Sequence, residues 1–516
     1  MLSLCNKIET ITFSEDIKMF YTSTRDKSIK VTASQAIAQG ISKEGGLFVP
    51  CCLPQFSIDK IKSMTDMSYI DRAKTVLREF LTDFNEEELD YCVNGAYAKE
   101  KFSSSKIAPT VNINGNENIL ELWHGPTCAF KDMALQLLPY LMTVSAKKTA
   151  DGKTIVILVA TSGDTGKAAL EGFKNVDNTK ILVFYPVHGV SPMQKLQMTT
   201  QEGDNVAVCA INGNFDDAQS AVKSIFTNDD IKSQLAEKNM MFSSANSINW
   251  GRLVPQIVYY FSAYCDLLEQ GRINAGDEIN VVVPTGNFGN ILAGYYAKQM
   301  GLPIKKLVCA SNTNNVLTDF LKTGEYNRNR KFYATTSPSM DILISSNLER
   351  LLYHMSGEDS ELVTNLMASL QNDGKYQVSP QLISDIQSVF DAGYCDEKSV
   401  DDTIKHIFDE HKYLCDTHTA VAVNVYENYV KETGDDITTV IDSTASPYKF
   451  SKSVLCAVLG GKTPDLDEFD MVDELNKVTS AQVPEPLKAL KDKKVRFSNV
   501  CDKENMSEMV FELLNL

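Results

Sequence analysis

Lys131 is the residue whose place in the sequence most strongly suggests chemistry. It follows Trp123-His-Gly-Pro-Thr-Cys-Ala-Phe130, and the glycine-proline step predicts that a helix begins near Phe130. The dipole at a helix start disfavours a lysine, so this position and its apolar neighbours predict a lowered pKa for the amine. An uncharged amine can form a Schiff base with an aldehyde. The alternative interpretation is an ordinary Lys-Asp pair on the surface.

A glycine turn is predicted at residues 285–290, where Thr285-Gly-Asn-Phe-Gly-Asn290 follows a run of β-branched residues. Gly286 and Gly289 allow positive φ angles and close backbone approach, and Asn290 is expected to cap the helix that follows. Such a turn presents unpaired N–H groups to an anion. It contains no lysine or arginine, so the backbone would hold a bound phosphate. A tight turn without a ligand explains the pattern equally well.

Two further segments place hydroxyl groups after predicted strands. The first, named the threonine turn, is Thr161-Ser-Gly-Asp-Thr-Gly-Lys167. It is not a nucleotide-binding P-loop, because Thr161 replaces the first glycine and Ala168 replaces the magnesium-binding hydroxyl. Its hydroxyls at a helix start suit a carboxylate, although an ordinary capped helix is the favoured explanation. The second, Asp442-Ser-Thr-Ala-Ser-Pro-Tyr-Lys449, offers hydroxyls or is simply a loop.

Short apolar runs alternate with helical patterns after residue 118 and predict the elements that position these segments. Near-continuous apolar strands separated by helices indicate parallel sheets covered on both faces, so the expected fold class is α/β. Ligands of such sheets bind beyond the carboxyl ends of the strands, where the turns described above begin. The predicted strands are 155–160, 181–185, 206–211, 279–283, 307–310 and 438–442.

The spacing of the runs predicts two lobes and a separate N-terminal region. Residues 1–105 are expected to be mainly helical, and residues 151–244 to form a smaller α/β domain. Residues 106–150 and 245–516 are expected to form a larger α/β domain, with a helical stretch over 345–435. A cleft between two such lobes is a common place for a ligand.

The composition argues against several kinds of partner. The chain has 516 residues and a formal net charge of -17, which disfavours nucleic acid and anionic membrane surfaces. No apolar run is long enough to span a bilayer, and the first twenty residues resemble neither a secretory signal nor a transit peptide. The twelve cysteines are scattered without a C-x-x-C pair, which predicts reduced core residues. We therefore expect a cytoplasmic protein with a small-molecule substrate.

Taken in order, these segments resemble the threonine synthase family. Trp123–Asp132 is similar to the family's cofactor-lysine segment, and Ala160–Gly166 to its substrate-binding loop. Asp416-Thr-His-Thr-Ala-Val421 is similar to a late motif of the family, with Thr417 in place of proline. Further similar segments are Tyr21–Arg25, Glu44–Pro50, Asn246–Arg252 and Gly286–Asn290. A single glycine loop is weakly specific, whereas the ordered set is highly specific.

The resemblance implies a pyridoxal 5'-phosphate enzyme of fold type II, the tryptophan-synthase-β-like class. Lys131 would carry the cofactor as an aldimine, and Thr444 would hydrogen-bond the pyridine nitrogen. The substrate carboxylate would lie among Ser162, Asp164 and Thr165. The cofactor phosphate would be held by Gly286, Asn287, Phe288, Gly289 and Asn290.

The implied reaction converts O-phospho-L-homoserine and water to L-threonine and phosphate. One rival hypothesis is another lyase or replacement enzyme of the same cofactor class, and another is a non-catalytic relative. The substrate phosphate needs its own cation, for which Arg252 and Lys167 are the candidates. A structural ion pair is the alternative for each, and for Lys167 the two interpretations are equal. A monomer and a homodimer are both compatible with the sequence.

One departure from the family's pattern, one rival residue and two weaker patterns complete the prediction. Ser446 stands where the family commonly has histidine, and Asp442 is a lower-ranked rival of Thr444 for the pyridine nitrogen. Cys128 is expected to be a small core residue rather than a reactive thiol. A zinc site is not expected, because the three candidate ligands lack a fourth nearby. Those candidates are His411, Cys415 and His418.

Overall fold

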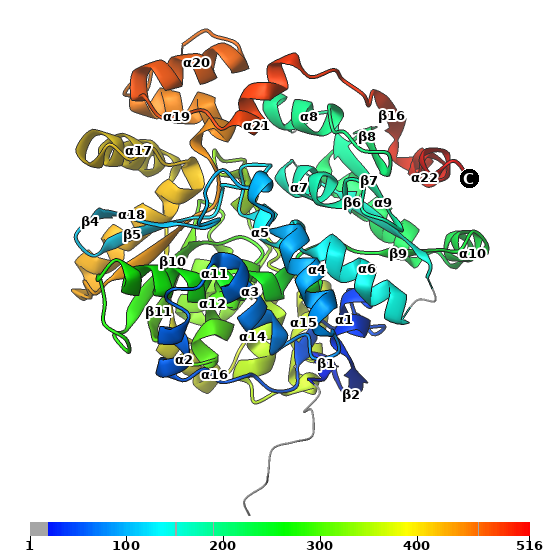
Figure 1. Cartoon of the computed structure of the whole chain (residues 1–516), viewed down its shortest axis with the longest axis horizontal. Helices are drawn as coiled ribbons and strands as arrows, with labels where there is room; N and C mark the ends of the chain where they lie inside the picture. Colours follow the sequence, from blue (N-terminus) through cyan, green and yellow to red (C-terminus); the bar gives the residue numbers. More distant parts are fainter. Residues whose placement is uncertain (1–18, 150–151, 162, 189, 463) are drawn as a thin grey trace, which may run out of the picture.

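Two parallel sheets form the frame of the protein, whose structure is a computed structural model (Figure 1). The described residues are 19–149, 152–161, 163–188, 190–462 and 464–516. The six predicted strands are all present, three in each sheet, because their β-branched runs are buried on both faces.

The larger sheet has six strands in the order β14-β11-β10-β15-β5-β4. Its neighbours run parallel except for β4, which pairs antiparallel with β5. Because β15 lies between β10 and β5 and the three strands are parallel, the segments that follow them meet at the carboxyl end of the sheet. The bounds are β4 Thr110–Asn114, β5 Glu117–Glu121, β10 Ile279–Pro284, β11 Ile304–Ser311, β14 Phe390–Tyr394 and β15 Thr439–Ser443.

The smaller sheet has five parallel strands in the order β16-β8-β7-β6-β9. Its edge strand β16 lies far from the others in sequence, and Figure 1 shows it in red beside β8. The bounds are β6 Thr154–Ala160, β7 Thr179–Pro186, β8 Val206–Asn212, β9 Met240–Ser243 and β16 Asn499–Asp502. The division of the chain into domains stays a prediction, and β16 joins the smaller sheet from the C-terminal part of the chain.

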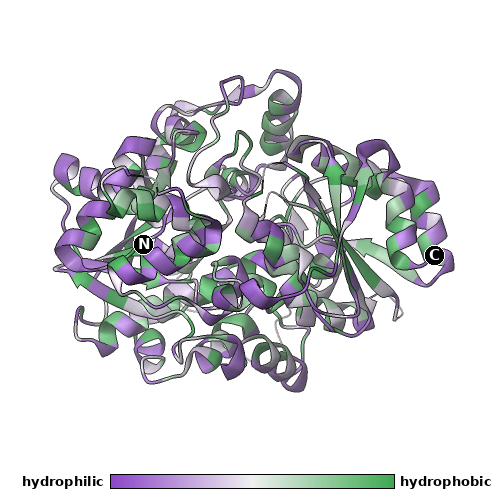
Figure 2. Cartoon of the chain, turned by 90° about the horizontal axis from the view of Figure 1, so that it is seen from above, coloured by the Kyte–Doolittle hydropathy of each residue, from purple (hydrophilic) through white to green (hydrophobic). Residues whose placement is uncertain are grey.

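Alternating residues of the central strands face two different apolar clusters. In β10, Val281 and Val283 pack in the cluster that contains α11 (Trp250–Glu269) and α12 (Gly289–Gln299). Val282 instead packs in the cluster that contains α17 (Glu397–His411) and α18 (Thr417–Thr433). Successive side chains of a strand point to opposite faces, so helices cover both faces of the sheet. Figure 2 shows the same arrangement, with green strands inside helices whose outer faces are purple.

The N-terminal region and the region 345–435 are less helical than the sequence predicts. A small antiparallel sheet is formed by β1 (Tyr21–Ser23), β2 (Asp26–Val31) and β3 (Phe48–Pro50). Strand β14 interrupts the second region and joins the larger sheet. These strands are short, or carry Asp391 and Gly393 in the case of β14, so they lack the continuous apolar run that identified the others.

No helix among the described residues combines the length and apolarity needed to cross a membrane. A two-stranded ribbon is formed by β12 (Glu325–Asn327) and β13 (Lys375–Gln377). The helices are α1 Ala33–Gln39, α2 Ile58–Ser63, α3 Tyr69–Arg78, α4 Glu86–Ala96, α5 Lys131–Leu135, α6 Leu138–Thr149, α7 Asp164–Phe173, α8 Pro192–Thr199, α9 Phe215–Thr227, α10 Asp229–Glu237, α11 Trp250–Glu269, α12 Gly289–Gln299, α13 Val316–Thr323, α14 Leu348–Met355, α15 Ser360–Asn372, α16 Pro380–Val389, α17 Glu397–His411, α18 Thr417–Thr433, α19 Ser451–Val458, α20 Glu468–Thr479, α21 Glu485–Lys488 and α22 Met506–Leu514.

Candidate active site

Lys131 is the first residue of α5 and follows Phe130 at the helix start, as the sequence predicts. Its side chain is 11% exposed. Burial lowers the pKa of the amine to about 8; Asp164 opposes this change, and Lys449 and Arg252 reinforce it. A fraction of the amine is therefore uncharged near neutral pH, as a nucleophile or general base requires.

Three groups surround the Lys131 amine. Nζ donates a hydrogen bond to Ser339 Oγ at 3.3 Å. The Asp164 carboxylate is farther away, with Oδ2 3.8 Å from Nζ, and the Phe130 ring centroid lies at 4.9 Å. The closest of these partners is thus a neutral hydroxyl, which orients the amine without a close anion to keep it protonated.

The glycine turn follows β10 and leads into α12. Within the described part of the chain, the backbone N–H groups of Gly286, Asn287 and Phe288 have no hydrogen-bond acceptor. Unpaired N–H groups before a helix suit an anion, because they add to the positive end of the helix dipole. The turn therefore has the donors that a phosphate would need.

The backbone of this turn differs from the prediction in two respects. Its left-handed residue is Phe288, with a φ of 60°, and neither glycine of the turn has a positive φ. Glycine is nevertheless required for close approach at position 286, where a Cβ would lie 2.8 Å from the Ser339 carbonyl oxygen. The predicted cap at Asn290 is wrong, because Phe288 holds the cap position and makes no side-chain cap bond.

The Asn290 side chain belongs to a buried network beneath the turn. Its Nδ2 donates to Asp442 Oδ2 at 2.9 Å, and its Oδ1 accepts hydrogen bonds from the hydroxyls of Tyr259 and Tyr260. Only the backbone N–H of Asn290 is left for an anion. Burial raises the pKa of Asp442 to about 7, and its Oδ1 has no partner among the described residues. Asp442 is thus bound to α11 and α12 beneath the turn.

Thr444 lies beside the Lys131 segment. The Phe130 N–H donates to the Thr444 carbonyl at 2.8 Å, which joins the loop after β15 to the start of α5. Ser446, two residues later, caps the short 3-10 helix η3 (Pro447–Phe450) by accepting from the Tyr448 N–H. The serine that replaces the family's histidine therefore has a structural task, and the ring-nitrogen contact of Thr444 stays a prediction.

The threonine turn is closed by its own side chains. Thr161 Oγ1 accepts hydrogen bonds from the N–H groups of Gly163 and Gly166 at 3.0 and 2.9 Å. At the start of α7, the Asp164 carboxylate lies 2.9 Å from the Nζ of Lys449, whose side chain is fully buried. In this turn, side chains therefore bond part of the backbone and pair with Lys449.

Asp164 is an anion in this arrangement. Burial opposes its ionisation, but the ammonium groups of Lys449 and Lys131 hold the pKa of its carboxyl well below the usual range. A negatively charged side chain does not itself attract a substrate carboxylate, and the predicted place of Asp164 beside that carboxylate stays a prediction. The N–H groups at the start of α7 and the half-buried Thr165 remain for such a carboxylate. Ser162 lies outside the described residues.

The two cations proposed for the substrate phosphate have different surroundings. Arg252 is buried, and the structure shows it no acidic partner within the described ranges. Its Nη1 donates to the Ala245 carbonyl at 2.6 Å, while its Nε has no acceptor there. Burial lowers the pKa of Arg252 to about 10, so it stays charged at neutral pH. Lys167, in contrast, pairs with Glu171 at 2.9 Å.

A segment that the sequence did not single out, residues 337–347, lies over the glycine turn. Ser345 Oγ donates to the Gly286 carbonyl at 2.8 Å, and the Asn347 N–H donates to the Asn287 carbonyl at 3.1 Å. Ser339, in the 3-10 helix η2 (Pro338–Met340), reaches Lys131. The only available signal was a group of hydroxyl residues around a proline, without periodicity.

The histidine and cysteine pattern does not assemble as a zinc site. Cys415 and His418 are buried, and His418 Nδ1 lies 2.7 Å from Asp416 Oδ2. His411 instead lies near His406 and Glu410, with the ligand atoms of the three residues within 4.8 Å of one another. The buried histidine therefore belongs to the neighbourhood of η2 rather than to a metal site with His411.

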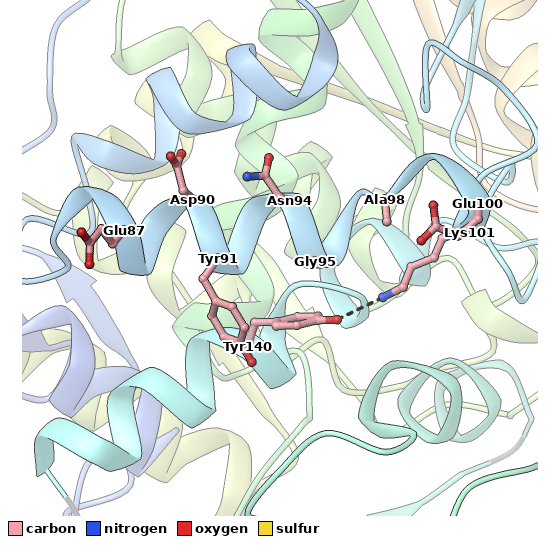
Figure 3. Close-up of a pocket in the computed structure, with 9 residues that line it drawn as sticks. All are labelled: Glu87, Asp90, Tyr91, Asn94, Gly95, Ala98, Glu100, Lys101 and Tyr140. Atoms are coloured by element: carbon pink, nitrogen blue, oxygen red, sulfur yellow. Dashed lines mark hydrogen bonds between the residues drawn. The ribbon is translucent and has the colours of Figure 1, made fainter.

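A surface hollow of about 750 Å³ lies between α4 and α6 rather than at Lys131 (Figure 3). Tyr91 and Tyr140 face each other in it, and Lys101 Nζ donates to the Tyr140 hydroxyl at 3.5 Å. None of the predicted site residues lines this hollow. We place the candidate site at Lys131 because that amine, and not the surface shape, has the chemistry.

Models of three protein families match the chain. Their descriptions are threonine synthase N terminus, over residues 20–97, pyridoxal-phosphate dependent enzyme, over 119–442, and threonine synthase, C-terminal, over 419–510. The second model covers more than half of the chain and includes Lys131 and the glycine turn.

Individual relatives agree with these models. Threonine synthase of Saccharomyces cerevisiae is 35% identical over 96% of this chain and 98% of its own length. Human threonine synthase-like 1 is 41% identical over 87% of this chain, which spans only 59% of that relative's length. The crystal structure of PLP-bound threonine synthase from Brucella melitensis superposes with a TM-score of 0.85, at 37% identity, over 96% of this chain and 99% of the other.

Proposed function

The chain belongs to the threonine synthase family of pyridoxal-phosphate-dependent enzymes, and from this premise we propose that it converts O-phospho-L-homoserine and water to L-threonine and phosphate. The fold is that of the fold type II enzymes. The observation that carries the proposal is the buried amine of Lys131, with a pKa of about 8, at the same sheet edge as a turn with unpaired N–H groups.

The residues present fit pyridoxal phosphate. When bound, this cofactor withdraws electrons from the substrate carbon next to the amino group. Lys131 would hold its aldehyde carbon, the N–H groups of Gly286, Asn287 and Phe288 would hold its phosphate, and the Thr444 hydroxyl would face its ring nitrogen. The free donors of the turn and the lowered pKa of Lys131 support this fit.

Lys131 is the proposed general base. The reaction removes protons at Cα and Cβ, expels the γ-phosphate and adds water at Cβ, and a single amine within reach of both carbons can carry these protons. The ion pair between Lys449 and Asp164 supports this role. Because Lys449 is 2.9 Å from Asp164 and Lys131 is 3.8 Å away, the anion is neutralised mainly by Lys449.

Arg252 is the proposed partner of the substrate phosphate. It influences the pKa of Lys131, so it lies within electrostatic reach of the amine. Its charge has no acidic partner in the described ranges, and an unpaired buried cation is costly until an anion binds. A guanidinium also matches phosphate oxygens with two parallel donors.

The direct test is product analysis. Purified protein supplied with pyridoxal phosphate is incubated with O-phospho-L-homoserine, and threonine and inorganic phosphate are measured together. Equal amounts of the two products are expected. Parallel incubations with serine, with threonine, and with O-phosphohomoserine plus sulfite identify a dehydratase or a replacement enzyme. Turnover of one of these without formation of threonine would refute the proposal.

A second candidate function uses the same site but gives a different product. The chain is 41% identical to proteins named threonine synthase-like 1, against 35% for the yeast threonine synthase. A related lyase acting on the same kind of phosphorylated amino acid would release phosphate without forming threonine, so the two-product assay separates the candidates. We also propose that the protein acts in the cytoplasm, and localisation of a tagged protein tests this.

A further inference from the structure

We propose that Ser339 is a further catalytic residue, whose hydroxyl aims the Lys131 amine and whose backbone N–H is held by the buried pair His418 and Asp416. The inference rests on the proposed function for its kinetic consequence. It concerns residues of the chain alone, so it also has a test that does not require turnover.

The contact between Ser339 and the amine is the first step. Lys131 Nζ donates to Ser339 Oγ at 3.3 Å, which is closer than the Asp164 carboxylate at 3.8 Å. A carboxylate at hydrogen-bond distance would hold the lysine protonated. A hydroxyl fixes the direction of the N–H groups with a weaker preference for the charged form, so the amine is oriented and still able to lose a proton.

The second step is how Ser339 is held. Its backbone N–H donates to His418 Nε2 at 3.2 Å, so that ring nitrogen must carry a lone pair. The ring proton is then on Nδ1, which donates to Asp416 Oδ2 at 2.7 Å. His418 is 2% exposed and Asp416 is fully buried. The histidine is thus fixed on both sides, and η2 with it.

The third step is why the Asp416 side chain is rigid. Asp416 caps α18, where its two carboxylate oxygens accept hydrogen bonds from the N–H groups of His418 and Thr419 at 2.9 and 3.1 Å. The position of η2 is therefore set by the start of a long helix that packs on the larger sheet. Arrangement by an element of the core gives the precision that an active-site hydroxyl needs.

The charged groups that face Lys131 lie on its own helix and on three other elements. They are Asp164 at the start of α7, Lys449 in η3, Arg252 in α11 and Asp132 in α5. None of them belongs to the η2 segment or to α18. A change at Ser339 or His418 therefore leaves the charged surroundings of the amine in place, and its effect reports on the hydroxyl.

The kinetic test compares Ser339→Ala with Ser337→Ala, which removes a buried hydroxyl from the same segment. We expect Ser339→Ala to lower kcat on the order of tenfold to a hundredfold, with KM changed less than about threefold, because orientation of the base is lost and binding is kept. Ser337→Ala should retain most of kcat. An equal loss in both variants would overturn the proposal in favour of a general effect on the segment.

The role of His418 is tested by two replacements. His418→Gln offers an amide oxygen to the Ser339 N–H, whereas His418→Leu does not. We expect the glutamine variant to keep more activity than the leucine variant, and the double variant Ser339→Ala with His418→Leu to lose no more than the larger single loss. Additive losses would show that the histidine does not act through Ser339. Thermal melts confirm folding, and Ser339→Ala remains decisive if His418→Leu does not fold.

The final measurement does not use turnover. The cofactor-free full chain is labelled with acetic anhydride at a series of pH values, and the acetylation rate of Lys131 is followed by mass spectrometry. The Ser339 hydroxyl accepts from the charged amine, so its loss should lower the pH at which Lys131 becomes reactive. An unchanged profile would overturn the inference. A wild-type protein that forms no threonine refutes only the proposed function, and the labelling still decides about Ser339.

Discussion

The glycine turn and the threonine turn follow similar strands but differ in how their polar groups are bonded. Each follows a buried parallel strand and leads into a helix, α12 in one case and α7 in the other. In the glycine turn, three consecutive N–H groups have no acceptor in the described part of the chain. In the threonine turn, Thr161 accepts two backbone bonds and Asp164 is paired with a buried lysine.

The difference shows that the backbone donors of two similar turns can be left unused or can be bonded by a side chain of the turn itself. The side chains of the glycine turn point elsewhere: Asn290 bonds to Asp442 beneath it. In the threonine turn the polar side chains satisfy the local backbone and form ion pairs instead. In the threonine turn, Asp164 and Lys449 therefore hold charges in place around Lys131, while the N–H groups at the start of α7 stay available.

The largest expected effect comes from removing the amine beside the binding turn. Lys131→Ala should lower kcat for O-phosphohomoserine at least on the order of a thousandfold, because the general base and the attachment point are lost together. Phosphate release is the measurement. The matched control is Lys167→Met at the threonine turn, where the loss of an ion pair should reduce thermal stability and leave kcat within a fewfold. Substantial activity of Lys131→Ala would break the assignment.

The contribution of Asp442, beneath the glycine turn, to the stability of the fold should depend on pH. The pKa of Asp442 is raised to about 7 by burial, so its contribution to stability is full below the pKa of the unfolded chain and is lost as pH rises through about 7. The Asp442→Asn variant has no carboxyl at this position, so it does not lose this stability as the pH rises. Between about pH 5.5 and about pH 8.5, the free energy of unfolding of the variant should rise relative to that of the wild type by about 2 kcal/mol.

Urea unfolding at the two pH values measures this difference. Asp132, whose pKa is raised to about 6 by burial, titrates in both proteins and cancels in the comparison. A difference that does not change with pH would mean that the carboxyl beneath the turn ionises as freely in the folded protein as in the unfolded one.

The smallest expected effect distinguishes the two buried cations, Arg252 and Lys167. Arg252→Lys should raise KM for O-phosphohomoserine about tenfold, with kcat changed less than about threefold, because one ammonium cannot replace a bidentate guanidinium. Steady-state kinetics give both constants. Lys167→Met again serves as the control and should leave KM unchanged. If Arg252→Lys has the wild-type KM, the phosphate is held elsewhere.

What the sequence predicted well depends on local pattern. The apolar runs of β6, β7, β8, β10, β11 and β15 are long enough to identify them, and Gly125 with Pro126 marks where α5 can begin. Each of these features is determined within a few residues, so a single sequence contains the information. The lowered pKa of Lys131 was also predicted, but its largest cause is burial by distant segments, which the local pattern does not report.

What the sequence missed depends on contacts between distant segments. Ser339 matters because η2 is brought against Lys131 and His418, and nothing in Ser337-Pro-Ser-Met340 reports that. The left-handed residue of the glycine turn is Phe288, although glycine is the usual choice. The charge state of Asp164 likewise follows from Lys449, which is distant in sequence and close in space.

Strand β16 has a consequence for how the chain reaches its folded state. It pairs with β8, so until residues 499–502 have been synthesised, one side of the five-stranded sheet offers unpaired N–H and C=O groups to any neighbouring chain. Pairing of segments so far apart is slow, because a very large loop must close first. During synthesis, the β8 edge therefore stays open to pairing with other chains until β16 is available to cover it.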